Sequence, residues 1–365
     1  MKVTLVISKL SGGGAERVAC NLANHFARAG WEVGMLTFDE VPPCEVLDES
    51  IVCTTLLTAR EKSTVSIFNL LRRLPRLHKY LRTQPMDACI VMLPIPTILV
   101  LALSCLTKAR IIAAERGEPT RYKRLFQQLL RRLCPRAAAW VFQTETVRGW
   151  YLPYLGDVPG VIIPNAINPA FLAAPVEGER EKTIVSVGRL CPQKNFGLLI
   201  RAFARIAPAH PEHRLVIYGR GGLLEELQAL ARELGVADRV DFPGHVDDMP
   251  QRLRRAGMYV LSSDYEGMPN ALIEAMAQGL PCVATDCDGG GARFLVEDGW
   301  NGLLIPIRDE AAMAAAIGRF LSDRELAQAL GHNALQVRQT LAPERIYGLW
   351  QDVVTSACIK GNEKI

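Results

Sequence analysis

The stretch Glu266-Gly-Met-Pro-Asn-Ala-Leu-Ile-Glu274 carries two carboxylates with seven residues between them. It follows the apolar run 258–262, which is typical of a buried strand, and it precedes 275–279, which is typical of a helix ended by glycine. Glu266 is therefore expected in a strand-to-helix turn and Glu274 about two turns inside the helix, with roughly 10 Å between the two carboxylates. Two carboxylates that face one cleft can accept hydroxyls from both ends of a ligand.

The backbone N–H groups of Gly267, Met268 and Asn270 lie between these glutamates, at the expected start of the helix. The N-terminal end of a helix favours negative charge, because its first N–H groups have no partner within the helix. Pro269 lacks an N–H, which is tolerated at this position for the same reason. We therefore expect this turn to face an anionic group of the ligand.

The strand–turn–helix pattern repeats along the chain. Apolar runs alternate with helical stretches, which indicates parallel sheets covered by helices on both faces. A break follows Asn165, with Pro169, Pro175 and Gly178 before a charged segment, and the alternation then restarts. The length of 365 residues also favours two domains. The expected strands are 2–7, 31–38, 88–93, 110–114, 139–143 and 160–163, then 183–187, 214–218, 239–242, 258–262, 281–285 and 302–305.

Charge and cysteine usage narrow the class of protein. Residues 1–171 hold 21 Lys and Arg against 13 Asp and Glu, so this half is expected to face something anionic. Ten cysteines without metal spacing are typical of buried thiols in a reducing compartment. Lys9 and Gly12 interrupt the first apolar run too early for a signal peptide. The uncharged stretch 88–107 is long enough to span a bilayer, but Pro94 and Pro96 favour a strand followed by a buried helix.

Parallel α/β sheets bind ligands beyond the C-terminal ends of their strands, and cationic residues stand at one such position. Arg189 follows the expected strand 183–187, and Lys194 opens the next helix. A guanidinium and an ammonium at a helix start suit a diphosphate, although two solvated surface cations are the alternative. The backbone near Val246, after strand 239–242, is expected to meet a flat base.

Three glycines follow the first expected strand. Gly12, Gly13 and Gly14 allow the backbone to approach a ligand and to aim N–H groups at an oxyanion, although a tight turn without a ligand is the alternative. The stretch departs from Gly-x-Gly-x-x-Gly at its last position, which argues against a dinucleotide-binding dehydrogenase.

Together these motifs resemble the retaining GT-B glycosyltransferases of family 4. The resemblance rests on Gly-Gly-Ala-Glu-Arg17, Gly-Arg-x4-Lys194, Glu-x7-Glu274 and Glu-Asp-Gly-Trp-Asn-Gly-Leu-Leu304. It implies two Rossmann-like doubly wound α/β domains facing a central cleft, with a C-terminal helix that crosses back to the N-terminal domain. The implied domains are an acceptor domain, residues 1–168 with 343–365, and a nucleotide-sugar domain, residues 169–342.

The resemblance also implies roles for residues. Glu266 would hold the donor sugar, Arg189 and Lys194 the donor diphosphate, and these three form the expected catalytic group. Donor binding would also involve Glu274 at the ribose, the N–H groups of Gly267, Met268 and Asn270 at the leaving phosphate, and Val246 at the base. The acceptor would meet Gly12, Gly13, Gly14, Glu115 and Arg116. The chain departs from its relatives at Arg116, where many have His, at Gly219-Arg-Gly-Gly222 and at Phe294.

The implied reaction is a retaining transfer of a hexosyl or N-acetylhexosaminyl group from a nucleotide sugar, expected to be UDP-linked, to a polyprenyl-diphosphate-linked glycan in bacterial polysaccharide assembly. No metal or other cofactor is expected, because Arg189 and Lys194 neutralise the diphosphate, although Asp286-Cys-Asp288 resembles a metal-binding Asp-x-Asp. A sugar-nucleotide epimerase, a transferase with a soluble acceptor and a non-catalytic sensor are the alternatives.

Two basic segments, 69–82 and 121–133, mix Arg and Lys with Leu, Phe and Tyr at helical spacing. This composition is typical of helices that lie on a membrane surface. We expect peripheral binding to the cytoplasmic face of the bacterial inner membrane, although two solvated helix faces are the alternative. Nucleic acid is not expected, because no aromatic stacking platform accompanies the charge. The expected docking residues are Arg72, Arg73, Arg131 and Arg132.

Overall fold

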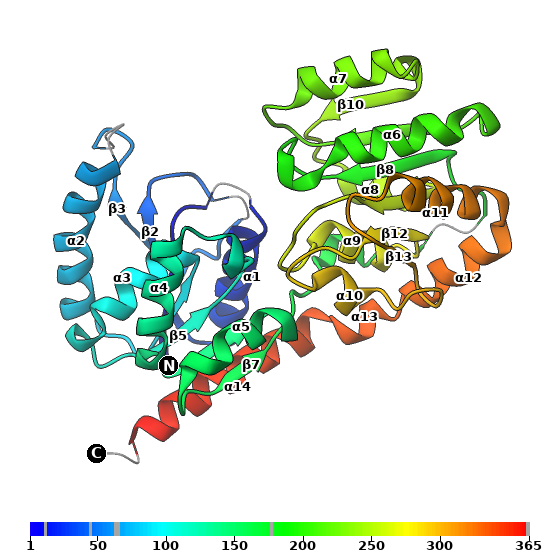
Figure 1. The fold of residues 1–365 in the computed structure, drawn as a ribbon. Helices are drawn as coiled ribbons and strands as arrows, with labels where there is room; N and C mark the ends of the chain where they lie inside the picture. Colours follow the sequence, from blue (N-terminus) through cyan, green and yellow to red (C-terminus); the bar gives the residue numbers. More distant parts are fainter. Residues whose placement is uncertain (11–12, 44–45, 62–65, 176–177, 363–365) are drawn as a thin grey trace. The chain divides into compact units, whose positions relative to one another are not determined.

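The structure is a computed structural model that describes residues 1–10, 13–43, 46–61, 66–175 and 178–362. It divides into two compact units, Met1–Asn165 with Glu344–Ile365 (unit 1) and Ala166–Pro343 (unit 2). Each unit consists of one parallel sheet with helices packed on it (Figure 1). The predicted α/β class with two Rossmann-like domains is therefore confirmed.

Unit 1 contains a seven-stranded sheet of order β3-β2-β1-β4-β5-β6-β7, in which every neighbouring pair is parallel. The chain runs outward from β1 to β3 and then returns to pair β4 with β1, so the order reverses between β1 and β4. The central strands are buried along almost their whole length, because helices cover both faces. The strands are β1 Lys2–Ile7, β2 Glu32–Asp39, β3 Val52–Leu57, β4 Ala88–Met92, β5 Arg110–Ala114, β6 Ala139–Phe142 and β7 Gly160–Ile162.

The helices of unit 1 include the last helix of the chain, α14 (Pro343–Asn362), drawn in red in Figure 1. Arg110 of β5 donates from Nε to the Ala357 carbonyl at 3.0 Å, and the rings of His25 and Tyr347 lie 4.9 Å apart. These contacts confirm the predicted return of the C-terminal helix to the N-terminal domain. The other helices are α1 Gly14–Arg28, α2 Ser66–Thr83, α3 Pro94–Ala102, α4 Arg124–Leu133 and α5 Glu145–Leu155.

Unit 2 contains a six-stranded parallel sheet of order β10-β9-β8-β11-β12-β13. Its core packs Phe196 and Phe203 of α6 against the sheet, with Met313 of α11 beside them. The strands are β8 Thr183–Val187, β9 Arg214–Tyr218, β10 Val240–Gly244, β11 Met258–Leu261, β12 Cys282–Thr285 and β13 Leu303–Ile305. The helices are α6 Phe196–Ile206, α7 Leu224–Glu233, α8 Met249–Arg255, α9 Asn270–Ala277, α10 Gly291–Leu295, α11 Glu310–Ser322, α12 Arg324–Ala334 and α13 Val337–Thr340.

The uncharged stretch 88–107 folds as the strand β4 followed by α3 and a short 3-10 helix, Ser104–Leu106. Pro94 is the first residue of α3, where its missing N–H costs nothing. Among the residues that the structure describes, no helix combines the length and the apolar character needed to cross a membrane.

Candidate active site

The predicted donor-binding residues gather at one edge of the sheet of unit 2. All neighbouring strands are parallel, so the loops that leave their C-terminal ends lie along the same edge. Arg189, exposed, and Lys194 follow β8, whereas Val246 follows β10 and Glu266 follows β11. Because β8 pairs directly with β11, the loops that carry Lys194 and Glu266 are neighbours.

Lys194 and Glu266 form an ion pair within this edge. Nζ of Lys194 lies 2.6 Å from Oε1 of Glu266, with 15% and 11% of the two side chains exposed. The hydroxyl of Ser263, a fully buried residue, donates to the same oxygen at 2.8 Å. The sequence predicts a lysine for the diphosphate and a glutamate for the sugar, and the structure adds that the two bind each other.

Two glycines allow this arrangement. A Cβ on Gly188 would lie 2.7 Å from Cε of Lys194, so the lysine reaches Glu266 by running across a residue without a side chain. A Cβ on Gly291 would lie 2.1 Å from the Gly267 carbonyl oxygen, so the start of α10 packs directly on the turn after Glu266. A larger residue at Gly188 would displace the Lys194 side chain, and a larger residue at Gly291 would displace the backbone of the turn.

Asp264 ties three loops together beside the ion pair, a role that sequence analysis does not predict. Its Oδ1 accepts from Nδ2 of Asn195 at 2.9 Å, and its Oδ2 accepts from Nε and Nη2 of Arg308 at 2.9 and 2.7 Å. Asn195 and Arg308 both have positive φ, 45° and 59°, an uncommon conformation for residues other than glycine. The sequence feature that could indicate this role is a carboxylate a few residues after a buried strand.

Glu274 is buried in α9, at 6% exposure. The helix begins at Asn270 with Pro269 as its N-cap, so Glu274 lies at the start of the second turn rather than two turns in as expected. Met268 is buried, whereas Gly267 and Asn270 are partly exposed. The N–H groups expected to face the leaving phosphate therefore stand in the turn just before the helix and at its first residue.

The Asp-x-Asp stretch is engaged by a guanidinium. Arg293 donates from Nε and Nη2 to the two carboxylate oxygens of Asp286, at 2.7 and 2.8 Å. A bidentate pair of this kind occupies one lone pair on each oxygen of Asp286.

In unit 1, Glu115 is a buried carboxylate at the end of β5 with donors on both oxygens. Its Oε1 accepts from the N–H groups of Arg116 and Gly117 at 2.9 and 3.0 Å and from the Tyr122 hydroxyl at 2.6 Å. Its Oε2 accepts from the Tyr151 hydroxyl at 2.5 Å. Burial raises the pKa of Glu115, and these hydrogen bonds partly offset the effect. Glu115 thus organises the loop on which Arg116 stands.

Arg116 lies between this loop and the last helix. Its guanidinium carbon is 5.1 Å from the centre of the Trp350 ring, and its Nη1 donates to Oδ1 of Asn165 at 3.1 Å. Burial lowers the pKa of Arg116 to about 10, which still leaves it charged at pH 7. Its Nε and Nη2 are buried without a hydrogen-bond partner in the described part of the chain.

The N-terminal glycines are only partly described, because Gly12 lies outside the described residues. Gly13 is the N-cap of α1, and Gly14 is its first residue. The Glu16 carboxylate folds back over this turn, since a Cβ on Gly13 would lie 2.2 Å from its Oε2. A side chain at Gly13 would therefore displace the Glu16 carboxylate.

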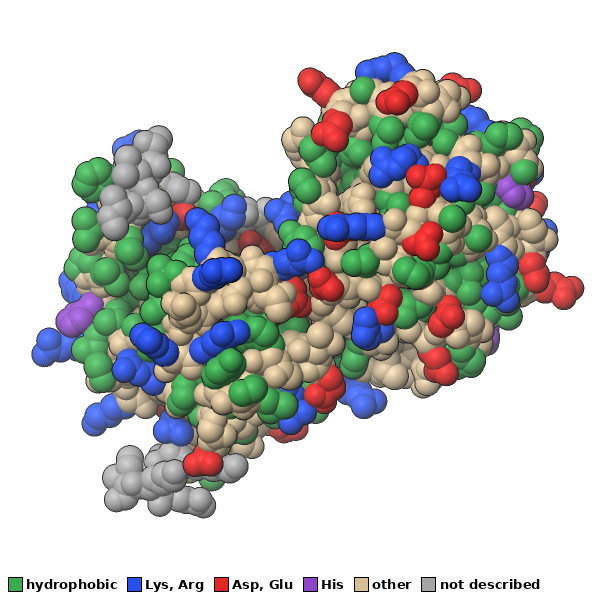
Figure 2. Space-filling view, viewed as in Figure 1, with side chains coloured by type: hydrophobic (Ala, Val, Ile, Leu, Met, Phe, Trp, Pro, Cys, Tyr) green, Lys and Arg blue, Asp and Glu red, His purple; other side chains and the backbone are tan. Residues whose placement is uncertain are grey.

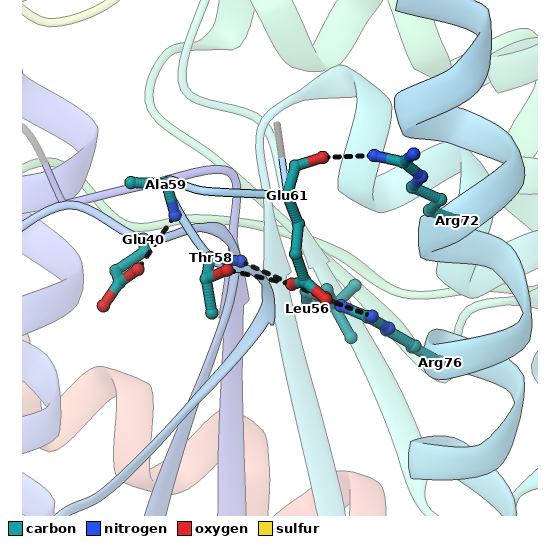
Figure 3. A network of polar contacts seen from close by, with 7 residues as sticks. All are labelled: Glu40, Leu56, Thr58, Ala59, Glu61, Arg72 and Arg76. Atoms are coloured by element: carbon teal, nitrogen blue, oxygen red, sulfur yellow. Dashed lines mark hydrogen bonds and ion pairs between the residues drawn. The ribbon is translucent and has the colours of Figure 1, made fainter. Parts of the chain in front are cut away.

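The four predicted docking residues differ in their surroundings. Arg72 donates to the Glu61 carbonyl, beside the pairing of Arg76 with the Glu61 carboxylate at 2.6 Å (Figure 3). Arg73 pairs with Asp39, and only 15% of its side chain is exposed. Arg131 lies over the rings of Trp150 and Tyr154, at 4.6 and 5.0 Å, whereas Arg132 is exposed.

Exposed cations and apolar side chains nevertheless share one surface of unit 1. Lys123, Arg124 and Arg132 are exposed on and before α4, and Leu125 between them is 61% exposed. Figure 2 shows Lys and Arg side chains interspersed with hydrophobic ones over the part of unit 1 that contains α4 and α5. We call Lys123, Arg124, Leu125 and Arg132 the α4 patch.

The two parallel α/β units and the charged edge of unit 2 define a GT-B type of protein, and comparisons with known proteins agree. The family model "Glycosyltransferase Family 4" matches residues 12–171, and "Glycosyl transferases group 1" matches residues 169–337. The chain belongs to the family 4-type GT-B glycosyltransferases.

Individual relatives extend this result. An exopolysaccharide phosphotransferase of Streptomyces coelicolor is 32% identical over 76% of this chain, which spans 29% of that protein. The Campylobacter jejuni "GalNAc-alpha-(1->4)-GalNAc-alpha-(1->3)-diNAcBac-PP-undecaprenol alpha-1,4-N-acetyl-D-galactosaminyltransferase" is 27% identical, covering 92% of this chain and 93% of its own. The structure of Anabaena HepE with UDP and glucose superposes with a TM-score of 0.82 at 20% identity, over 98% of this chain and 100% of HepE.

Proposed function

We propose that this protein transfers a hexosyl or N-acetylhexosaminyl group from a UDP-sugar to a hydroxyl of a polyprenyl-diphosphate-linked glycan, with retention of the anomeric configuration. The main support for a nucleotide-sugar donor is the Lys194–Glu266 pair, at the edge of unit 2 where parallel sheets bind ligands. Arg189 is exposed on the same loop as Lys194. Support for the nucleotide comes from HepE, a neighbour in fold whose structure holds UDP and glucose.

The charges suit a diphosphate leaving group. Arg189 and Lys194 neutralise the oxygens on which negative charge develops, so this chain needs no metal ion for that purpose. Glu266 holds hydroxyls of the donor sugar, and Ser263 keeps its carboxylate in place when the Lys194 ammonium turns to the phosphate. Glu274 holds the ribose hydroxyls.

In the proposed transfer, the bond between the anomeric carbon and the diphosphate oxygen breaks as the acceptor hydroxyl oxygen bonds the same carbon. The hydroxyl proton passes to the departing diphosphate, which guides the acceptor to the face that it leaves. The configuration is therefore retained without a carboxylate nucleophile. Arg116, whose guanidinium is held by Asn165 and Trp350, and the turn at Gly13 and Gly14 contact the acceptor.

The acceptor half rests on the relatives and on charge. The Campylobacter jejuni relative carries a diNAcBac-PP-undecaprenol glycan in its name, and the basic half of this chain suits an anionic lipid surface. We therefore propose a peripheral position on the cytoplasmic face of a bacterial inner membrane.

Incubation with a panel of nucleotide sugars tests the proposal, with undecaprenyl-diphosphate-linked glycans, free sugars or no acceptor in parallel. Transfer from a UDP-sugar to the lipid-linked glycan is the expected result. Conversion of the nucleotide sugar without an acceptor would instead show an epimerase. Equal transfer to free sugars would remove the lipid-linked acceptor from the proposal, and binding without turnover would indicate a sensor.

A further inference from the structure

A cluster of metal-ligating side chains lies in unit 2, in the turn that leads into β9. His210, Glu212 and His213 each offer one ligand atom, and these atoms all lie within 4.8 Å of one another. The turn follows a short 3-10 helix, Ala207–Ala209, at the end of α6. None of the three residues belongs to the donor or acceptor groups described above.

The backbone of this turn is fixed by one guanidinium. Arg239 donates from Nη2 to the carbonyls of His210 and His213 at 2.5 and 2.7 Å, and from Nη1 to the Ala207 carbonyl at 2.8 Å. The guanidinium carbon in turn lies 5.3 Å from the centre of the Phe203 ring. Ligands that project from a backbone held in this way lose little conformational freedom when they bind an ion.

One imidazole nitrogen of the cluster lies close to the carboxylate but makes no hydrogen bond to it. Nδ1 of His213 lies 3.2 Å from Oε1 of Glu212, yet it is buried and makes no hydrogen bond with the described residues. The rings of His210 and His213 stand nearly perpendicular, with centres 5.9 Å apart. A buried polar atom without a partner is a rare feature that an ion between the three side chains would satisfy.

We propose that His210, Glu212 and His213 bind one divalent transition-metal ion of the zinc type, with water as the fourth ligand. Two imidazoles and one carboxylate match the ligand preferences of zinc, whereas calcium and magnesium prefer oxygen ligands alone. Bonds of about 2.0–2.1 Å in a tetrahedral site place ligand atoms roughly 3.3 Å apart. The separation of 3.2 Å between His213 and Glu212 already fits that value.

The ion has a structural role, because its site lies at the wrong edge of the sheet for the transfer reaction. His213 directly precedes β9, at the N-terminal end of the strand, whereas Lys194 and Glu266 follow the C-terminal ends of β8 and β11. In a parallel sheet these ends lie on opposite edges. The ion ties the end of α6 to the start of β9.

The test measures metal binding by the whole 365-residue chain without a polyhistidine tag. Protein stripped with a chelator and dialysed is titrated with Zn²⁺ against a chromophoric competitor, and with Co²⁺ by visible absorption. We expect one ion per chain, a tetrahedral Co²⁺ spectrum and a raised Tm with Zn²⁺. His210→Ala and Glu212→Gln should each weaken binding by more than the tenfold to hundredfold typical of an outer-shell partner.

His245→Ala is the matched control, because this exposed histidine also lies near a carboxylate, with Nε2 3.7 Å from Asp247. It should bind Zn²⁺ as the unmodified protein does. Glu212→Gln keeps the test valid if the histidine variants unfold, since circular dichroism can show that this isosteric change preserves the fold. Two results would overturn the proposal. One is equal Zn²⁺ binding by the unmodified, His210→Ala and Glu212→Gln proteins, and the other is that the unmodified protein takes no Zn²⁺ from the chromophoric competitor.

Discussion

Nζ of Lys194 lies 2.6 Å from Oε1 of Glu266, and both side chains are largely buried in the loops that follow β8 and β11 of unit 2. The two groups that sequence analysis assigns to different parts of one donor thus neutralise each other in the structure. In the proposed function, a diphosphate would compete with Glu266 for the same ammonium. Removing one partner of such a pair leaves the charge of the other uncompensated. A substitution of Glu266 and a substitution of Lys194 should therefore change different kinetic constants.

Glu266→Gln should lower kcat and leave the donor KM unchanged or lower. The amide loses a charged hydrogen bond to the reacting sugar, worth about 1.5–3 kcal/mol or roughly tenfold to a hundredfold in rate, while Lys194 becomes free for the diphosphate. Lys194→Met should instead raise the donor KM. Steady-state kinetics with varied UDP-sugar, with calorimetric titration of UDP, separate the two effects. A raised KM for Glu266→Gln with normal kcat would contradict the assignment.

Glu274→Ala should raise the donor KM by about tenfold to a hundredfold with a smaller change in kcat. Hydrogen bonds from ribose hydroxyls to a carboxylate are made equally in the ground and transition states, and each such bond is worth about 1.5–3 kcal/mol. Because Glu274 is buried in α9, thermal unfolding of the variant must first show an intact unit 2. An unchanged donor KM in a folded variant would exclude the ribose role.

Most of the fold could be predicted because buried parallel strands appear in the sequence as continuous apolar runs. The sequence pattern does not indicate β3, because this strand lies at the edge of its sheet, where Val52 is 67% exposed and Thr54 and Thr55 interrupt the apolar run. The sequence predicts site roles for Lys194 and for Glu266, but their pairing depends on β8 lying beside β11, and the two residues are 72 positions apart in the chain. The local sequence pattern does not show that β8 and β11 are neighbours in the sheet.

The same limit applies to the basic helices. The sequence predicts that Arg73 docks on a membrane, whereas in the structure it pairs with Asp39, 34 residues earlier in the chain. The sequence predicts the same role for Arg131, which lies over aromatic rings of α5. Helical spacing identifies a charged face correctly, but it cannot show which cations already have partners within the fold.

Transfer should proceed in EDTA at the rate measured without it, and the product should retain the donor's anomeric configuration. Arg189 and Lys194 supply positive charge at the diphosphate, and Arg293 engages the Asp286 carboxylate. The measurements are initial rates with EDTA, Mg²⁺ or Mn²⁺ and the anomeric proton coupling of the product by NMR. Activity that EDTA abolishes and Mg²⁺ or Mn²⁺ restores would contradict the first part, and an inverted product the second.

The pKa of Glu61 should lie well below that of an ordinary glutamate. Hydrogen bonds from Arg76, then from Thr58, lower the pKa of Glu61 from 4.5 to about 2. A carboxyl whose pKa is lower in the folded state stabilises the fold above the unfolded value, and this stabilisation is lost as the pH falls from 4.5 to 2. Arg76→Gln should raise the pKa towards 4.5, as measured by carboxyl ¹³C NMR titration. Arg82→Gln, at the end of the same helix, should leave it unchanged; a wild-type value near 4.5 would refute the pairing in solution.

Binding to anionic vesicles should depend on the α4 patch rather than on Arg73 or Arg131. Each cation near an anionic surface is worth about 1 kcal/mol, so Arg124→Gln with Arg132→Gln should weaken partitioning by roughly 2 kcal/mol, or about 30-fold. Flotation with phosphatidylglycerol vesicles should recover the unmodified protein at low salt and release it at high salt, because exposed charges are screened. Arg232→Gln with Arg255→Gln, two exposed changes in unit 2, is the matched control and should float normally.

Equal flotation of both double variants would show that the α4 patch does not hold the protein on the vesicles. A protein that stays in solution at low salt and glycosylates a free sugar as well as a lipid-linked one would exclude membrane docking altogether.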